Sequence, residues 1–148
     1  MMYSFFVTLH ALPAGATAEA ARELAGQTVR TLAVDPQALS TTAFDCSFET
    51  ARQRLSQLER MYCEGDGSFV WVSPQGGGPA WQVDGNLYDR NERLLFVDLK
   101  GTCPSGQFDH LLAACGWPQT KVMFQLTREA VFLDEAEFRR WAGENKGG

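Results

Sequence analysis

The sequence predicts a single α+β domain, in which a mainly antiparallel sheet of about five to six strands carries about three to four packed helices. Strand-like alternation of apolar and polar residues dominates residues 81–101, whereas several other stretches place apolar residues at helical spacing. A chain of 148 residues with 45% hydrophobic and 21% charged residues is ordinary for one globular domain. We expect residues 1–143 to form this domain and residues 144–148 to fray.

The most strongly patterned stretch, residues 81–101, is expected to form a β-hairpin. Because strand side chains alternate between faces, the apolar faces of its two arms coincide only if the loop has an odd number of residues, such as residues 90–92. This register places Asp84 directly across from Asp98, with Lys100 diagonal to Asp84. Facing like charges destabilise a sheet, so the acid pair is the sharpest functional feature of the sequence. The apolar side chains expected to be buried together are Trp81, Val83, Val97 and Leu99.

The flanking elements follow from periodicity and from capping residues. Strands are expected at residues 3–12, 41–46, 68–73 and 121–126, with an extended segment at 130–133. Helices are expected at residues 18–34, 48–62 and 104–115, and a last helix opens at Asp134. Ser47 is an expected N-cap, Asp134 and Glu137 form a capping box, and Asp35-Pro36 ends the first helix. The glycine-rich residues 74–79 read as a connector, because no Gly-Lys-Ser/Thr is present and no helix follows.

Charge and cysteine spacing exclude some classes of protein. The net charge of −5 argues against a broad nucleic-acid or anionic-membrane surface. No apolar run approaches the ~18 residues of a membrane span, and the apolar N-terminal run lacks a basic flank and is interrupted by His10. None of the four cysteines has C-x2-C spacing, so we expect buried reduced thiols, although disulfides remain open. We therefore expect a cytoplasmic protein.

The expected order from residue 47 onward is helix, three strands, helix and strand, and Asp84 precedes Asp98-Leu99-Lys100 on the neighbouring strand. This arrangement resembles the core of the PD-(D/E)XK nuclease superfamily over residues 47–126, about half of the chain. The resemblance implies that Asp84 and Asp98 hold Mg2+, that Glu59 is the helix carboxylate, and that Lys100 is the catalytic lysine. A hard divalent cation between facing carboxylates would relieve their repulsion and could activate a water for phosphodiester cleavage.

A plainer interpretation is that Asp84, Asp98 and Lys100 belong to the solvated face of a half-exposed antiparallel sheet. A second functional class is then a non-catalytic binding or regulatory domain with a protein partner. Its support is the aromatic content, because interfaces favour tryptophan, and the candidate interface residues are Trp71, Trp81, Trp117 and Trp141. We prefer this binding domain, with no cofactor, and keep the Mg2+-dependent nuclease, the only case with a nucleic-acid partner, as the alternative. Whether the chain is an enzyme stays open.

Overall fold

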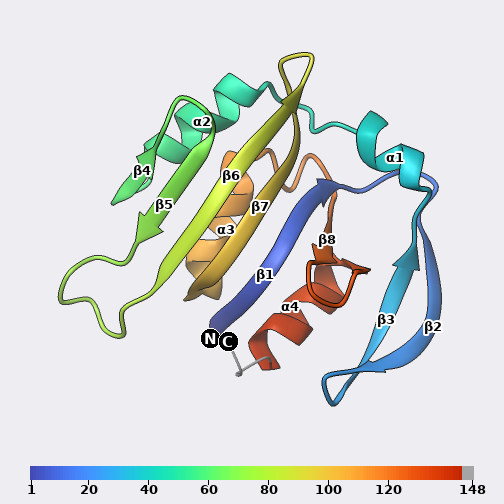
Figure 1. The fold of residues 1–148 in the computed structure, drawn as a ribbon. Helices are drawn as coiled ribbons and strands as arrows, with labels where there is room; N and C mark the ends of the chain where they lie inside the picture. Colours follow the sequence, from blue (N-terminus) through green and yellow to red (C-terminus); the bar gives the residue numbers. More distant parts are fainter. Residues whose placement is uncertain (145–148) are drawn as a thin grey trace.

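The structure, a computed structural model, describes residues 1–144. Nine antiparallel strands form one sheet in the order β2-β3-β9-β8-β1-β7-β6-β5-β4, and the described residues also form four helices (Figure 1). The α+β class and the antiparallel sheet are as predicted, but the sheet has more strands than expected. The fraying expected at residues 144–148 lies outside the described residues, except for Glu144 at the end of the last helix.

The strands span 3 to 12 residues. They are β1 Met2–Ala11, β2 Thr17–Leu24, β3 Gln27–Ala33, β4 Met61–Cys63, β5 Ser68–Val72, β6 Gln82–Arg90, β7 Arg93–Pro104, β8 Val122–Leu126 and β9 Val131–Asp134. The helices are α1 Pro36–Thr41, α2 Phe48–Ser56, α3 Ser105–Ala114 and α4 Glu135–Glu144.

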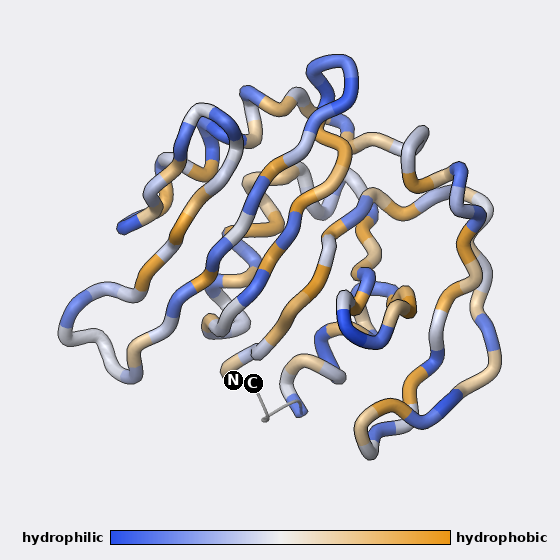
Figure 2. Tube along the Cα trace, in the orientation of Figure 1, coloured by the Kyte–Doolittle hydropathy of each residue, from blue (hydrophilic) through white to orange (hydrophobic). Residues whose placement is uncertain are grey.

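Helices α2, α3 and α4 pack on one face of the sheet, and we call the opposite face the uncovered face (Figure 1). Strand alternation sends Tyr3, Phe5, Val7 and Leu9 of the central strand β1 toward the helices, where all four are buried. Aromatic rings join the two layers, since the ring of Phe138 stacks on the ring of Phe124 with centroids 3.9 Å apart. Polar residues gather at turns such as the tip of the β6–β7 hairpin (Figure 2).

The helix predicted over residues 18–34 is wrong, because this stretch forms the β2–β3 hairpin. Its turn is Ala25-Gly26, and both residues adopt positive φ angles, 49° and 83°. A glycine at the centre of the stretch favours such a turn over a continuous helix. The apolar residues also fit strand alternation, because Val29 and Thr31 are buried on one side of β3.

Two neighbouring expectations are also wrong. Residues 41–46 do not form a strand: Asp35 instead caps α1 by accepting a hydrogen bond from Gln37 N, and Pro36 takes the first helical position, where its missing N–H costs nothing. The helix expected over residues 48–62 ends at Ser56, and residues 61–63 form strand β4. Gln57 is the C-cap, and Arg60, with a φ of 60°, then redirects the chain into strand β4.

The predicted N-caps of α2 and α4 are confirmed, but the reciprocal bond of the capping box is not formed, because the Glu137 carboxylate accepts from Arg30 N and Arg140 instead. Ser47 Oγ accepts a hydrogen bond from Thr50 N at 3.0 Å, and Asp134 Oδ1 accepts one from Glu137 N at 2.8 Å. None of the helices within residues 1–144 is both long and apolar enough to cross a membrane.

Candidate functional site

The β6–β7 hairpin has the predicted faces but a different register. Asp84 lies opposite Lys100, and Asp98 lies opposite Asn86, so the predicted facing pair of Asp84 and Asp98 is wrong. The connecting turn has two residues, Asn91-Glu92, both with positive φ. An extra residue in β7, between the partners of Tyr88 and Asp89, restores the parity that a two-residue turn would otherwise break. The four predicted core residues Trp81, Val83, Val97 and Leu99 are all buried.

This register removes the electrostatic conflict that the sequence suggested. Asp84 faces a lysine across the strands, an opposite-charge arrangement, and also accepts a hydrogen bond from Gln82 Nε2 at 2.9 Å. Asp98 accepts a hydrogen bond from Thr8 Oγ1 at 2.8 Å. Both carboxylates and Lys100 point to the uncovered face, each with a polar partner or neighbour, so neither carboxylate needs a cation for its charge to be tolerated.

Glu59 does not join these residues. It is exposed in the turn after α2, and its carbonyl oxygen accepts a hydrogen bond from Trp71 Nε1 at 3.0 Å. Among residues 1–144, no group of three or more His, Cys, Asp or Glu side chains is placed to hold a metal ion. The structure thus brings Asp84, Asp98 and Lys100 to one face and leaves Glu59 elsewhere.

The four tryptophans mostly fill the interior. Trp71, Trp81 and Trp141 are buried, and the rings of Trp71 and Trp81 meet edge to face at 4.9 Å. Trp117 is half-buried and donates its indole N–H to Glu135 at 2.7 Å. Core packing therefore accounts for much of the tryptophan content, but Trp81 and Trp141 also line hollows described below.

The uncovered face combines polar side chains with partly exposed aromatic ones. One cross-strand row runs from Tyr62 through Val70, Asp84 and Lys100 to Phe6. Tyr62 is 59% exposed and Phe6 37% exposed, unusual values for large apolar side chains. Large aromatic side chains usually lie in the interior, and only strand parity reveals the position of these two: of the doublet Phe5-Phe6, one ring must point away from the helices.

A second polar group on this face surrounds His10, which is only 6% exposed. Its Nε2 lies 3.0 Å from Gln125 Oε1, and its ring is flanked by Phe96 and Phe132, with centroids 5.9 and 6.0 Å away. Burial lowers the pKa of His10, although Gln125 and the charge of Asp98 oppose that shift. His10 therefore acts as a neutral, hydrogen-bonded member of the packing.

The sheet has an opening beside the first half of β1. Strand β8 pairs with β1 only from Val7 to Ala11, and then the chain turns back, with Thr127 N donating to the Phe6 carbonyl. Because backbone groups alternate in direction along a strand, the N–H and C=O of Ser4 point into this opening, where no strand of residues 1–144 pairs with them. Helix α4 passes behind the opening (Figure 1).

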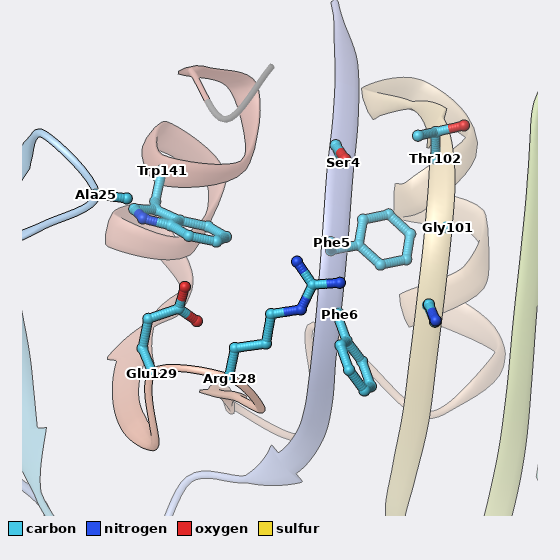
Figure 3. A pocket seen from close by; sticks show the side chains of 10 residues that line it. Ser4, Phe5, Phe6, Ala25, Gly101, Thr102, Arg128, Glu129 and Trp141 are labelled. Carbon is cyan, nitrogen blue, oxygen red and sulfur yellow. The ribbon is translucent and has the colours of Figure 1, made fainter. Parts of the chain in front are cut away.

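A hollow of about 360 Å³ occupies the opening. Its residues come from β1, β7, the β2–β3 turn, the β8–β9 turn and α4; they are Ser4, Phe5, Phe6, Ala25, Lys100, Gly101, Thr102, Arg128, Glu129 and Trp141. Figure 3 shows Arg128 reaching from the β8–β9 turn toward β1. In this view Trp141 lies across the hollow from β1, and Glu129 lies below Trp141.

Two cations share the Phe6 ring at this hollow. Lys100 Nζ lies 5.0 Å and Arg128 Cζ 5.6 Å from the ring centroid, within the range of cation–π attraction. Neither residue belongs to any of the ion pairs within residues 1–144, although Asp84 faces Lys100 and Glu129 follows Arg128. The lining carries two positive charges and one negative charge in a chain whose net charge is −5.

A second, more open hollow of about 570 Å³ lies beneath the glycine-rich connector between β5 and β6. It is lined by Arg60, Trp81, Gln82 and residues of the connector, and it shares Gly101 and Thr102 with the first hollow. The connector interpretation of residues 74–79 holds, since no helix follows them.

No protein-family model, curated protein or solved structure matches this chain.

Proposed function

We propose that this chain is a non-catalytic binding domain, and that its ligand brings a negatively charged group to the hollow beside Phe6. One observation carries the proposal: Lys100 and Arg128 both lie within cation–π distance of one partly exposed aromatic ring, at an opening in the sheet. Cation–π contacts of about 0.5–1 kcal/mol each favour positions of the two side chains over the ring without neutralising their charges. A ligand anion can therefore meet cations that are already in position, which lowers the cost of ordering them.

The rest of the lining suits a ligand that is partly apolar. Phe5, Phe6 and Trp141 supply aromatic surface, while the hydroxyl groups of Ser4 and Thr102, and the backbone of Ser4 that no described strand pairs with, supply hydrogen bonds. Among the described lining residues there is no His or Cys, and the carboxylate of Glu129 lies beside the cations. The composition favours binding over proton transfer or nucleophilic chemistry.

The test compares two dyes that differ in charge. Anilinonaphthalene sulfonate carries an aromatic system and a sulfonate, and N-phenylnaphthylamine has a closely similar aromatic system without the anion. We expect the sulfonate to bind more tightly, and Arg128→Gln and Lys100→Gln each to weaken it about fivefold, the equivalent of about 1 kcal/mol. Binding of the neutral dye should be unchanged in both variants.

Lys121→Gln is the matched control, because Lys121 is an exposed cation that does not line the hollow. It should bind both dyes as the unmodified protein does. Equal affinity for the two dyes, or sulfonate binding that survives both substitutions at the hollow, would refute the proposal.

The Mg2+-dependent nuclease-like activity stands as the alternative proposal. Its support is that Asp84, Asp98 and Lys100 share the uncovered face of two adjacent strands. Asp84 and Asp98 are diagonal neighbours in that register, and a cation between them would share each carboxylate with the hydrogen bond that it already accepts, from Gln82 and from Thr8.

A further inference from the structure

The two hollows adjoin on the sheet, because both are lined by Gly101 and Thr102, and we call them together the trough. Strand register places Val72, Gln82, Thr102 and Ser4 in a single cross-strand row, and every member of this row lines one hollow or both. The trough therefore runs perpendicular to the strands, from the connector beside β5 to the opening beside β1. Gly101 lies where the hollows meet, and any side chain there would collide with the carbonyl of Gln82.

Positive charge stands at both ends of the trough. Lys100 and Arg128 lie at the β1 end, and Arg60 lies at the connector end. Arg60 Nη1 donates a hydrogen bond to the Ser73 carbonyl at 3.1 Å, which orients the guanidinium, and none of the ion pairs within residues 1–144 includes Arg60. The combined lining has three cations against the single carboxylate of Glu129.

The length of the trough selects a class of ligand. Neighbouring strands are about 4.8 Å apart, so the three steps from β5 to β1 cover about 14 Å. An extended peptide advances about 3.3 Å per residue and covers this distance with about four residues. Gln82, Thr102 and Ser4 provide polar side chains along the row, and these can bond to a peptide backbone.

We propose that the trough binds an extended acidic peptide segment of a partner protein, with carboxylates about four residues apart that reach the two cationic ends. This rests on the proposed function, because the β1 end is the same anion site. The peptide is favoured over a nucleic acid because a chain of net charge −5 repels a polyanion, whereas two separated carboxylates need only local positive charge.

Blocked, fluorescently labelled peptides of glycine and serine test the spacing. One peptide carries two glutamates about four residues apart, a second carries them side by side, and a third carries one glutamate. By fluorescence anisotropy we expect the spaced peptide to bind about fivefold more tightly than the other two, the gain of one further exposed charge pair. Arg60→Gln should remove this advantage and leave the single-glutamate peptide and the sulfonate dye unaffected, whereas Arg60→Lys should restore most of it.

The outcomes separate the two proposals. If the sulfonate dye depends on Lys100 and Arg128 but the spaced and adjacent peptides bind equally, the acidic-peptide trough is wrong and the anion site stands. If neither the dye nor the peptides depend on those cations, both are wrong. Tighter binding of oligothymidylate than of the spaced peptide would overturn the choice of a peptide. A melting temperature of Arg60→Gln equal to that of the unmodified protein excludes misfolding as the cause of any loss.

Discussion

At Gly85, strand β6 has no side chain because the ring of Phe69 occupies the space where a Cβ would lie. Phe69 is the cross-strand partner of Gly85 on β5 and is buried, so its ring has no open side to move into. Gly85→Ala should therefore destabilise the protein by about 1–3 kcal/mol, the usual cost of overpacking a core. Gly106→Ala is the control: Gly106 lies within α3 with nothing near its Cβ direction, so alanine there should stabilise by about 0.5–1 kcal/mol. Urea unfolding of both variants checks this, and a loss at Gly106 equal to that at Gly85 would contradict it.

Single residues also show which features of the hairpin could be predicted from the sequence and which could not. The burial of Val97 and Leu99 and the exposure of Lys100 follow from strand alternation alone. The partner of Asp84 does not, because the two-residue turn and the extra residue in β7 each move the register by one position, and together they keep every face unchanged. Parity was thus readable from the sequence, but the pairing on which the acid-pair hypothesis depended was not.

At the scale of elements, the β2–β3 hairpin shows why the helix prediction over residues 18–34 failed. The strand β2 is almost wholly exposed, so its alanines and charges carry little strand pattern. Strand β3 shares one paired position with β9, Leu32 with Phe132, and side chains of α4 satisfy part of its free edge. Arg30 N donates to Glu137 Oε2 at 2.8 Å, and Arg140 Nη2 donates to the Thr28 carbonyl at 2.6 Å. These long-range contacts decide between helix and strand, and no local periodicity reports them.

The attachment of this hairpin should depend on pH. The hydrogen bonds from Arg140 and from the Arg30 backbone lower the pKa of Glu137 below its ordinary value of 4.5. A carboxyl whose pKa is lower in the folded state stabilises that state above the unfolded pKa, and this contribution is lost as the pH falls through the folded pKa. Glu137→Gln should thus reduce the free energy of unfolding at neutral pH and converge with the unmodified protein in acid. Denaturant melts across pH measure this, with Glu64→Gln at an exposed turn as the control; a difference that stays constant into acid would contradict it.

For the molecule as a whole, the sheet and its helical layer could be predicted in class, whereas the opening beside β1 could not. The opening exists because β8 and β9 have 5 and 4 residues beside the 10 residues of β1. The ends of these strands are set by where the chain turns back, here at residues 127–130. The sequence predicted an extended segment at residues 130–133 but not the strands with which it pairs. The hollow, the position of Arg128 and the cation–π contacts of Phe6 all depend on that difference in strand length. The candidate site therefore could not be predicted from the sequence.

Thermal melting with millimolar Mg2+ weighs the binding domain against the nuclease-like alternative. We expect no rise in melting temperature, because Asp84 faces Lys100 and Asp98 already accepts a hydrogen bond from Thr8. A cation that bound only the folded state would raise it by mass action. Ca2+ and a matched increase in ionic strength serve as controls for nonspecific salt effects. A rise of several degrees that disappears in both Asp84→Asn and Asp98→Asn would favour the nuclease-like alternative.

The cysteines report on separation of the two layers of the molecule. Cys103 lies on the helix-facing side of β7 and Cys115 at the end of α3, and burial raises the pKa of each thiol to about 12. Because the thiolate is the reactive form, neither should react with an aromatic disulfide reagent until sheet and helices part. Cys63, half-buried on the edge strand β4, should react first, and Cys63→Ser should remove that fast phase.

All four cysteines are free thiols, so the unfolded protein should give four equivalents without reductant. Labelling of Cys103 and Cys115 should then follow the global unfolding rate as denaturant is added. Native reaction of these two at the rate of Cys63 would show that the layers open locally, and the helical layer would not be one cooperative unit with the sheet.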